Sequence, residues 1–152
     1  MYPTFLQTDK RWKSTTFSAS KLTIERWGCA ICSIANLLNF YKKTDTPDVL
    51  AKKLEFTPDG AVKWASVSKN YPDIQFKLYT DCSAVSAPLD KIDAFLAQDI
   101  PVIVATRMGI GRKQEHWVIL WKKWAGEYLC SDPLNGEIFF KDKYGDPKRW
   151  IY

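Results

Sequence analysis

The sequence contains no apolar run that approaches the roughly 20 residues needed to span a bilayer. Its first seven residues lack both the basic start and the apolar core of a signal peptide. We therefore expect a cytoplasmic protein without a signal peptide or membrane span, or one released by another route. Internal repeats, low-complexity tracts and linkers are also absent. Because 152 residues suit one domain with a real core, we expect a single domain over residues 1–152.

The sequence also lacks a cluster of cations. Its 22 Lys and Arg outnumber 17 Asp and Glu, which gives a formal net charge of +5, but the lysine pairs are scattered along the chain. A nucleic-acid-binding protein should show a grouped basic patch, so we expect no nucleic-acid partner. The net charge is compatible with attraction to another polyanion, such as an anionic cell wall.

Histidine is nearly absent, and cysteine is sparse. The four cysteines are Cys29, Cys32, Cys82 and Cys130. A dithiol motif at Cys29 and Cys32 would need a preceding βαβ pattern, which the chain lacks. A structural zinc site normally takes two close pairs, whereas Cys82 and Cys130 are isolated. We expect reduced thiols and no metal or cofactor, with Cys32 and Cys130 serving as small buried residues.

One stretch carries the strongest pattern. After Gly28, apolar residues recur at helical spacing, which predicts a helix over residues 29–42 with one face packed inward. The positions on this face are Ile31, Ile34, Ala35, Leu38 and Tyr41. Cys29 would lie in the first turn, where free N–H groups and the helix dipole favour an anion. A thiolate is such an anion, so Cys29 is a candidate nucleophile. Gly28 leaves room for another backbone or a substrate.

The remaining pattern predicts helices first and strands second. Short helices are expected over residues 47–54, capped by Thr46, and over 61–69; a strand over 74–79 and a helix after Pro88 follow. In the second half we expect strands over 102–105, 116–124, 127–131 and 137–140, a polar loop over 107–115, and a last edge strand over 149–152. This order predicts an α+β domain.

His116 is the sole histidine, and it begins a predicted strand directly after a glycine-bearing loop. Its unperturbed pKa suits a general base near neutral pH, so His116 is the natural partner of Cys29. If the two strands that follow form an antiparallel hairpin, Asp132 at the end of the second lies close to His116 and can orient its ring. Asn135 is a weaker alternative orienter. Gln7 is a candidate oxyanion donor beside the backbone N–H of Cys29.

These residues together resemble the peptidase-like domains related to the bacteriocin-leader-processing cysteine peptidases, within the papain-like superfamily. The resemblance covers residues 5 to 140 and depends on the order and spacing of several segments. The segments are Gln7-Thr8-Asp9-Lys10-Arg11-Trp12, Gly28-Cys29-Ala30, Pro101-Val102-Ile103-Val104, His116-Trp117-Val118-Ile119-Leu120, Tyr128 and Asp132-Pro133.

The resemblance implies a papain-like α+β fold, with an N-terminal nucleophile helix packed on a C-terminal antiparallel sheet. It implies that Cys29 is the nucleophile, His116 the base, Asp132 the residue that orients the histidine, and Gln7 part of the oxyanion hole. Ala30 departs from the glycine that leader-processing enzymes tend to have after the cysteine. The segments before Cys29 look more like the branch found in phage lysins and bacterial hydrolases.

The resemblance to this branch implies a cysteine peptidase or amidase that hydrolyses peptide bonds of bacterial peptidoglycan, as a phage endolysin of the bacterial cell wall does. We expect it to act as a monomer. Two alternatives stay open: a processing peptidase that cleaves a leader or other protein substrate, and a papain-like domain that has lost activity and only binds. A thiol-reactive probe separates an activated Cys29 from a binding-only domain.

Overall fold

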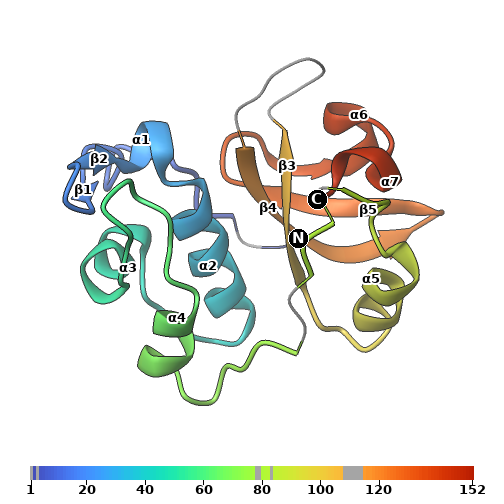
Figure 1. Cartoon of the computed structure of the whole chain (residues 1–152), viewed down its shortest axis with the longest axis horizontal. Helices are drawn as coiled ribbons and strands as arrows, with labels where there is room; N and C mark the ends of the chain where they lie inside the picture. The colour runs from blue at the N-terminus through green and yellow to red at the C-terminus, as the bar shows by residue number, and fades with distance from the viewer. Residues whose placement is uncertain (1, 3, 78–79, 83, 108–114) are drawn as a thin grey trace.

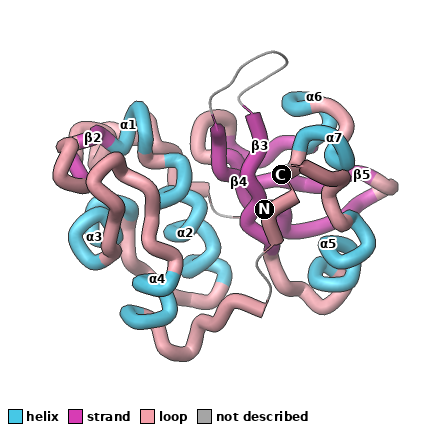
Figure 2. Tube along the Cα trace, viewed as in Figure 1, coloured by secondary structure: helices cyan, strands magenta, loops and turns pink. Residues whose placement is uncertain are grey.

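The computed structural model describes residues 2, 4–77, 80–82, 84–107 and 115–152. Its N-terminal part is mainly helical, and its C-terminal part is built on a sheet, as Figure 1 and the colouring of Figure 2 show. Within these ranges no helix is both long and apolar enough to cross a membrane. The order of helices and sheet confirms the predicted α+β class.

The helical part begins with a short hairpin of β1 (Thr16–Phe17) and β2 (Leu22–Thr23). Four helices follow: α1 (Ile24–Trp27), α2 (Cys29–Phe40), α3 (Pro47–Lys53) and α4 (Ala65–Asn70). Gly28 separates α1 from α2, and its N–H donates to the carbonyl of Ile24 at 2.8 Å. A Cβ at Gly28 would lie 2.6 Å from that carbonyl oxygen, so the close backbone approach requires glycine here.

Helix α2 confirms the strongest prediction. Ile31, Ile34 and Leu38 are fully buried and form a core with α3 and the N-terminal arm. Tyr41, which was expected on the same face, is instead 37% exposed. The helix ends at Phe40 and Lys42 adopts a positive φ of 62°, so the chain turns away and carries Tyr41 off the buried face.

The sheet consists of β3 (Val102–Arg107), β4 (Glu115–Trp124), β5 (Glu127–Asp132) and β6 (Gly136–Phe139), all antiparallel and in that order. Ala125 and Gly126, both at positive φ, make the two-residue turn between β4 and β5. Three helices complete the part: α5 (Leu89–Leu96), α6 (Phe140–Tyr144) and α7 (Pro147–Trp150).

Strand β4 is buried on both faces. Ile119 packs with Leu37 of α2, whereas Val118 and Leu120 pack with Ile92 of α5 and with α6. In Figure 1 the sheet accordingly lies between α2 on one side and α5, α6 and α7 on the other. Two-sided burial explains why the middle of this strand is continuously apolar. It also places the start of β4 beside the start of α2.

Three local predictions in the first half are wrong in detail. Residues 74–77 form no strand and pair with none in the described part of the chain, because Phe76 packs edge-on against Trp64 and stays 44% exposed; residues 78–79 lie outside the described part. The helix expected over 61–69 begins at Ala65, since the N–H of Ala61 donates to the hydroxyl of Thr57 in a turn. Thr46 is the N-cap residue of α3 as predicted, but its side chain makes no capping bond because its hydroxyl donates to the carboxylate of Asp48 at 2.6 Å.

The prediction of a C-terminal edge strand over residues 149–152 is also wrong. Residues 147–150 form α7 instead, because the carboxylate of Asp146 accepts the N–H of Lys148 at 3.0 Å and Pro147 occupies the first helical position. Most of the polar loop predicted over 107–115 lies outside the described residues, and its two ends, Arg107 and Glu115, are paired strand residues of β3 and β4.

Candidate active site

Cys29 is the first residue of α2 and is partly exposed. No side chain caps this helix start, so backbone N–H groups there are not taken by a cap. One turn further, Ser33 donates its hydroxyl to the carbonyl of Trp117 at 2.9 Å. This partly buried bond joins α2 to β4 next to His116, and it therefore helps to fix the position of α2 relative to the strand that carries the histidine.

His116 and Asp132 form a buried pair. His116 Nε2 lies 2.8 Å from Asp132 Oδ1, and the two side chains are 2% and 0% exposed. They come from the start of β4 and the end of β5, which pair with Ile119 opposite Ser131. The expectation that the hairpin brings these two residues together is confirmed by this distance.

Three further donors surround the carboxylate of Asp132. Its Oδ1 also accepts the N–H of Leu134 at 2.8 Å, and its Oδ2 accepts the Nδ2 of Asn135 at 2.6 Å and the hydroxyl of Tyr144 at 2.5 Å. Asn135, considered above as an alternative orienter, thus bonds to Asp132 rather than to His116. With both oxygens held, the carboxylate has one orientation toward the imidazole.

The charges of this site support one another. Burial alone would lower the pKa of His116, but hydrogen bonds with Asp132 and Cys29 and the charges of both outweigh it and raise the pKa from 6.5 to about 9. Burial likewise opposes ionisation of Asp132, yet the bond and charge of His116, with Tyr144 and Asn135, lower its pKa below the usual value. An imidazolium paired with the Asp132 carboxylate is therefore the favoured state near neutral pH.

Tyr144 was not predicted from the sequence. It lies in α6, and burial together with the charge of Asp132 raises its pKa, so its hydroxyl stays protonated and donates. Its ring packs against Phe140 and approaches the imidazole of His116, with ring centroids 5.1 and 6.2 Å apart. It is the last residue of a helix that was not predicted, and the sequence gave no local signal for it, since a tyrosine in a polar stretch has many possible roles.

Gln7 lies beside the same region. Its side chain is 3% exposed, its Nε2 donates to the carbonyl of Glu25 at 2.7 Å, and its backbone N–H donates to the carbonyl of Pro133 at 2.8 Å. These two bonds join the segment before Cys29 to the turn after Asp132. The structure thus holds Gln7 between α1, which ends just before Gly28 and Cys29, and the turn that follows Asp132.

The remaining cysteines have a different environment. Cys32 and Cys130 are fully buried, and burial raises the pKa of each thiol. All four cysteines are free, and in the described ranges no group of three or more His, Cys, Asp or Glu side chains is arranged to hold a metal ion. Cys32 and Cys130 have the burial predicted for small core residues.

The fold and this site define a class. A helix that starts at a cysteine packs against an antiparallel sheet that carries a histidine–aspartate pair, which is the papain-like α+β architecture. The chain belongs to the Peptidase_C39 like family, whose model matches residues 3–147. This match confirms the resemblance to cysteine peptidase domains of that type. Neither a curated protein nor a solved structure matches the chain.

Proposed function

We propose that this protein is an active cysteine peptidase or amidase, with Cys29 as nucleophile and His116 as its acid–base partner. The observation that carries the proposal is the buried contact of His116 Nε2 with Asp132 at 2.8 Å. The raised pKa of the same imidazole, to which Cys29 contributes beside Asp132, supports the pairing with Cys29. Asp132 occupies Nε2, which leaves Nδ1 as the ring nitrogen available to the thiol. A cysteine–histidine pair held by a third group is the arrangement that nucleophilic acyl transfer requires.

The reaction then proceeds in two steps. Cys29 Sγ, as the thiolate, attacks the substrate carbonyl carbon, and His116 transfers its proton to the leaving nitrogen as the C–N bond breaks. A water molecule attacks the resulting thioester while His116 accepts its proton, and the Cys29 sulfur leaves as the thiolate, which restores the starting thiolate–imidazolium pair. Asp132 keeps the imidazole oriented and stabilises its charged form throughout.

The oxyanion that develops in each step needs donors. We propose the backbone N–H of Cys29 at the uncapped start of α2 and the side-chain amide of Gln7. A primary amide carries two N–H groups, and the bond to Glu25 uses one of them, so the second is available to a substrate oxygen. Because Gln7 is buried, its amide is held in place and shielded from water, and a hydrogen bond from such a donor stabilises an oxyanion more strongly than one exposed to water.

For the substrate, we propose peptide bonds of bacterial peptidoglycan. Support comes from the resemblance of the segments before Cys29 to phage lysins and from the net charge of +5, which favours approach to an anionic wall. A leader or other protein substrate would use the same chemistry, so the substrate has to be decided by assay.

The test is amine release and turbidity loss from purified peptidoglycan, with wild type beside Cys29→Ala and Cys32→Ala. We expect wild type and Cys32→Ala to release amines and Cys29→Ala to release none. Cys32 is the matched control because it lies one turn further along the same helix and is fully buried. Activity on unstructured peptides but not on peptidoglycan would reject the wall substrate alone, whereas full activity of Cys29→Ala would reject the nucleophile.

A further inference from the structure

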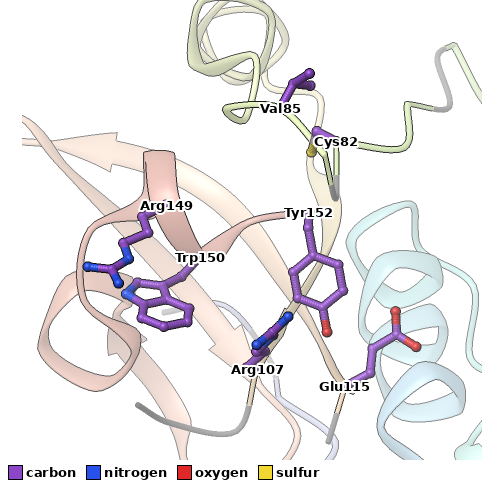
Figure 3. Close-up of a pocket in the computed structure, with 7 residues that line it drawn as sticks. All are labelled: Cys82, Val85, Arg107, Glu115, Arg149, Trp150 and Tyr152. Carbon is purple, nitrogen blue, oxygen red and sulfur yellow. The ribbon is translucent and has the colours of Figure 1, made fainter. Parts of the chain in front are cut away.

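A cavity of about 560 Å³ opens beside the candidate active site, on the sheet side of the molecule. Figure 3 shows how its walls are arranged: Arg149 and Trp150 stand on one side, Glu115 on the other, and Arg107 and Tyr152 between them. These residues come from the end of β3, the start of β4, α7 and the last residue of the chain, and Cys82 and Val85 from the segment before α5 complete the lining. A volume of this size accommodates an amino-acid side chain with its flanking backbone.

Two observations place this cavity near Cys29 and His116. Glu115 directly precedes His116 in β4. Tyr152 donates its backbone N–H to the carbonyl of Ala105 at 3.2 Å, and its pKa is raised by burial, by the charge of Glu115 and by the charge of Cys29. Tyr152 therefore lies within electrostatic reach of both Glu115 and Cys29. A peptide bound at Cys29 can extend into this cavity.

The charges in the cavity favour an anion at one end. The guanidinium of Arg149 lies 5.0 Å from the ring of Trp150, and that of Arg107 lies 5.8 Å from the ring of Tyr152. Within the described part of the chain, neither arginine takes part in an ion pair. A guanidinium over an aromatic ring keeps N–H donors in a planar fork that matches a carboxylate.

Glu115 would repel a ligand carboxylate, but its position away from Arg149 limits this repulsion. Burial raises the pKa of this carboxyl group, and Figure 3 places it across the cavity from Arg149. A ligand carboxylate near Arg107 and Arg149 thus meets two cations, while the carbon chain that carries it lies along the rings of Trp150 and Tyr152. The polarity runs from Glu115, whose cross-strand partner Arg107 lies between the two walls, to Arg149 at the opposite wall.

We propose that this cavity is a substrate subsite that binds a carboxylate of the peptide, through Arg107 and Arg149. The inference depends on the proposed peptidase function and adds a preference to it. The carboxylate can belong to an acidic side chain near the scissile bond or to a free C-terminus, since both present the same group to a guanidinium fork. Neutral peptides are then cleaved less efficiently for lack of this contact.

The first experiment measures kcat/KM on matched peptides that differ by Glu against Gln near the scissile bond, and by a C-terminal acid against an amide. Wild type should prefer one acidic member by roughly tenfold or more, and which pair responds identifies the source of the carboxylate. Arg107→Gln and Arg149→Gln should each reduce that preference, measured as the ratio of kcat/KM for the acidic peptide to kcat/KM for its neutral counterpart. An unchanged preference in both variants would overturn the subsite.

The control is Arg11→Gln. Arg11 also lies over an aromatic ring, 4.3 Å from that of Trp12, but it is paired with Asp9 away from the cavity. It should keep the full preference.

The second experiment separates the subsite from the catalytic proposal. Calorimetry with Cys29→Ala measures binding of an acetylated glutamyl dipeptide and its glutaminyl counterpart. If Cys29→Ala binds the acidic ligand more tightly and Cys29→Ala/Arg149→Gln loses this difference, the subsite is supported. If wild type nevertheless hydrolyses no peptide, the proposed function is rejected and the subsite is not. Equal binding of both ligands, together with equal kcat/KM, rejects the subsite while hydrolysis of neutral peptides would still uphold the function.

Discussion

Tyr144→Phe tests whether the buried carboxylate of Asp132 depends on the donors around it. The change removes only the hydroxyl that bonds Asp132 Oδ2 at 2.5 Å and keeps the ring that packs against Phe140. A hydrogen bond to a charged group contributes roughly 1.5–3 kcal/mol. Since His116, Leu134 and Asn135 still bond the carboxylate, we expect the lower end, about 1.5 kcal/mol of lost unfolding free energy near pH 7.

The pH dependence of this loss identifies its cause. The pKa of Asp132 is lower in the folded protein than its usual 3.8, so the stability from its bonds is present above that value and is lost as pH falls through the folded pKa. Urea denaturation of wild type and Tyr144→Phe should therefore give free energies that converge in acid. A loss that is equal at neutral and acid pH would refute the reasoning, because it would reflect packing alone.

Tyr128→Phe is the matched control for this measurement. Its hydroxyl bonds Asp93 at 2.6 Å, but that carboxylate is 39% exposed and also pairs with Lys123. Water and Lys123 can replace the lost donor, so we expect a loss of about 0.5–1 kcal/mol. Peptidase activity should be unchanged in Tyr128→Phe and reduced in Tyr144→Phe, where the orientation of His116 is loosened.

Three further predictions follow from the site. The pKa of His116 is raised from 6.5 to about 9, so the imidazolium is retained below that value, and kcat/KM should fall as pH rises through about 9; a fall centred near 6.5 would contradict the pairing. Iodoacetamide should label partly exposed Cys29 roughly tenfold or more faster than buried Cys32, as peptide mass mapping would measure; equal rates would contradict an activated nucleophile. Gly28→Ala should lose about 1–3 kcal/mol in thermal denaturation, because its Cβ would lie 2.6 Å from the carbonyl oxygen of Ile24; a neutral effect would show that α1 can shift freely.

Local patterns in the sequence determined much of this protein. The spacing of Ile31, Ile34 and Leu38 after Gly28 was enough to place α2 and to put Cys29 at its first turn, because helix start and apolar periodicity are properties of one short segment. The closeness of His116 and Asp132 followed from one hairpin, whose turn at residues 125–126 is also local. The strand predicted over residues 74–79 was wrong for residues 74–77, because alternation of apolar and polar residues does not show whether a neighbouring strand is there to pair with.

The tertiary structure alone decided the contacts that make these parts one site. The hydrogen bond from Ser33 to Trp117 joins residues that are 84 positions apart. The hydroxyl of Tyr144 donates to Asp132 from α6, a helix that the apolar pattern of the sequence did not predict. The cavity between Arg149 and Glu115 is likewise lined by residues from separate elements, among them β3, β4 and α7. Such contacts form only when separate elements pack together. They are therefore determined by the packing of the whole core, and no single segment of the sequence predicts them.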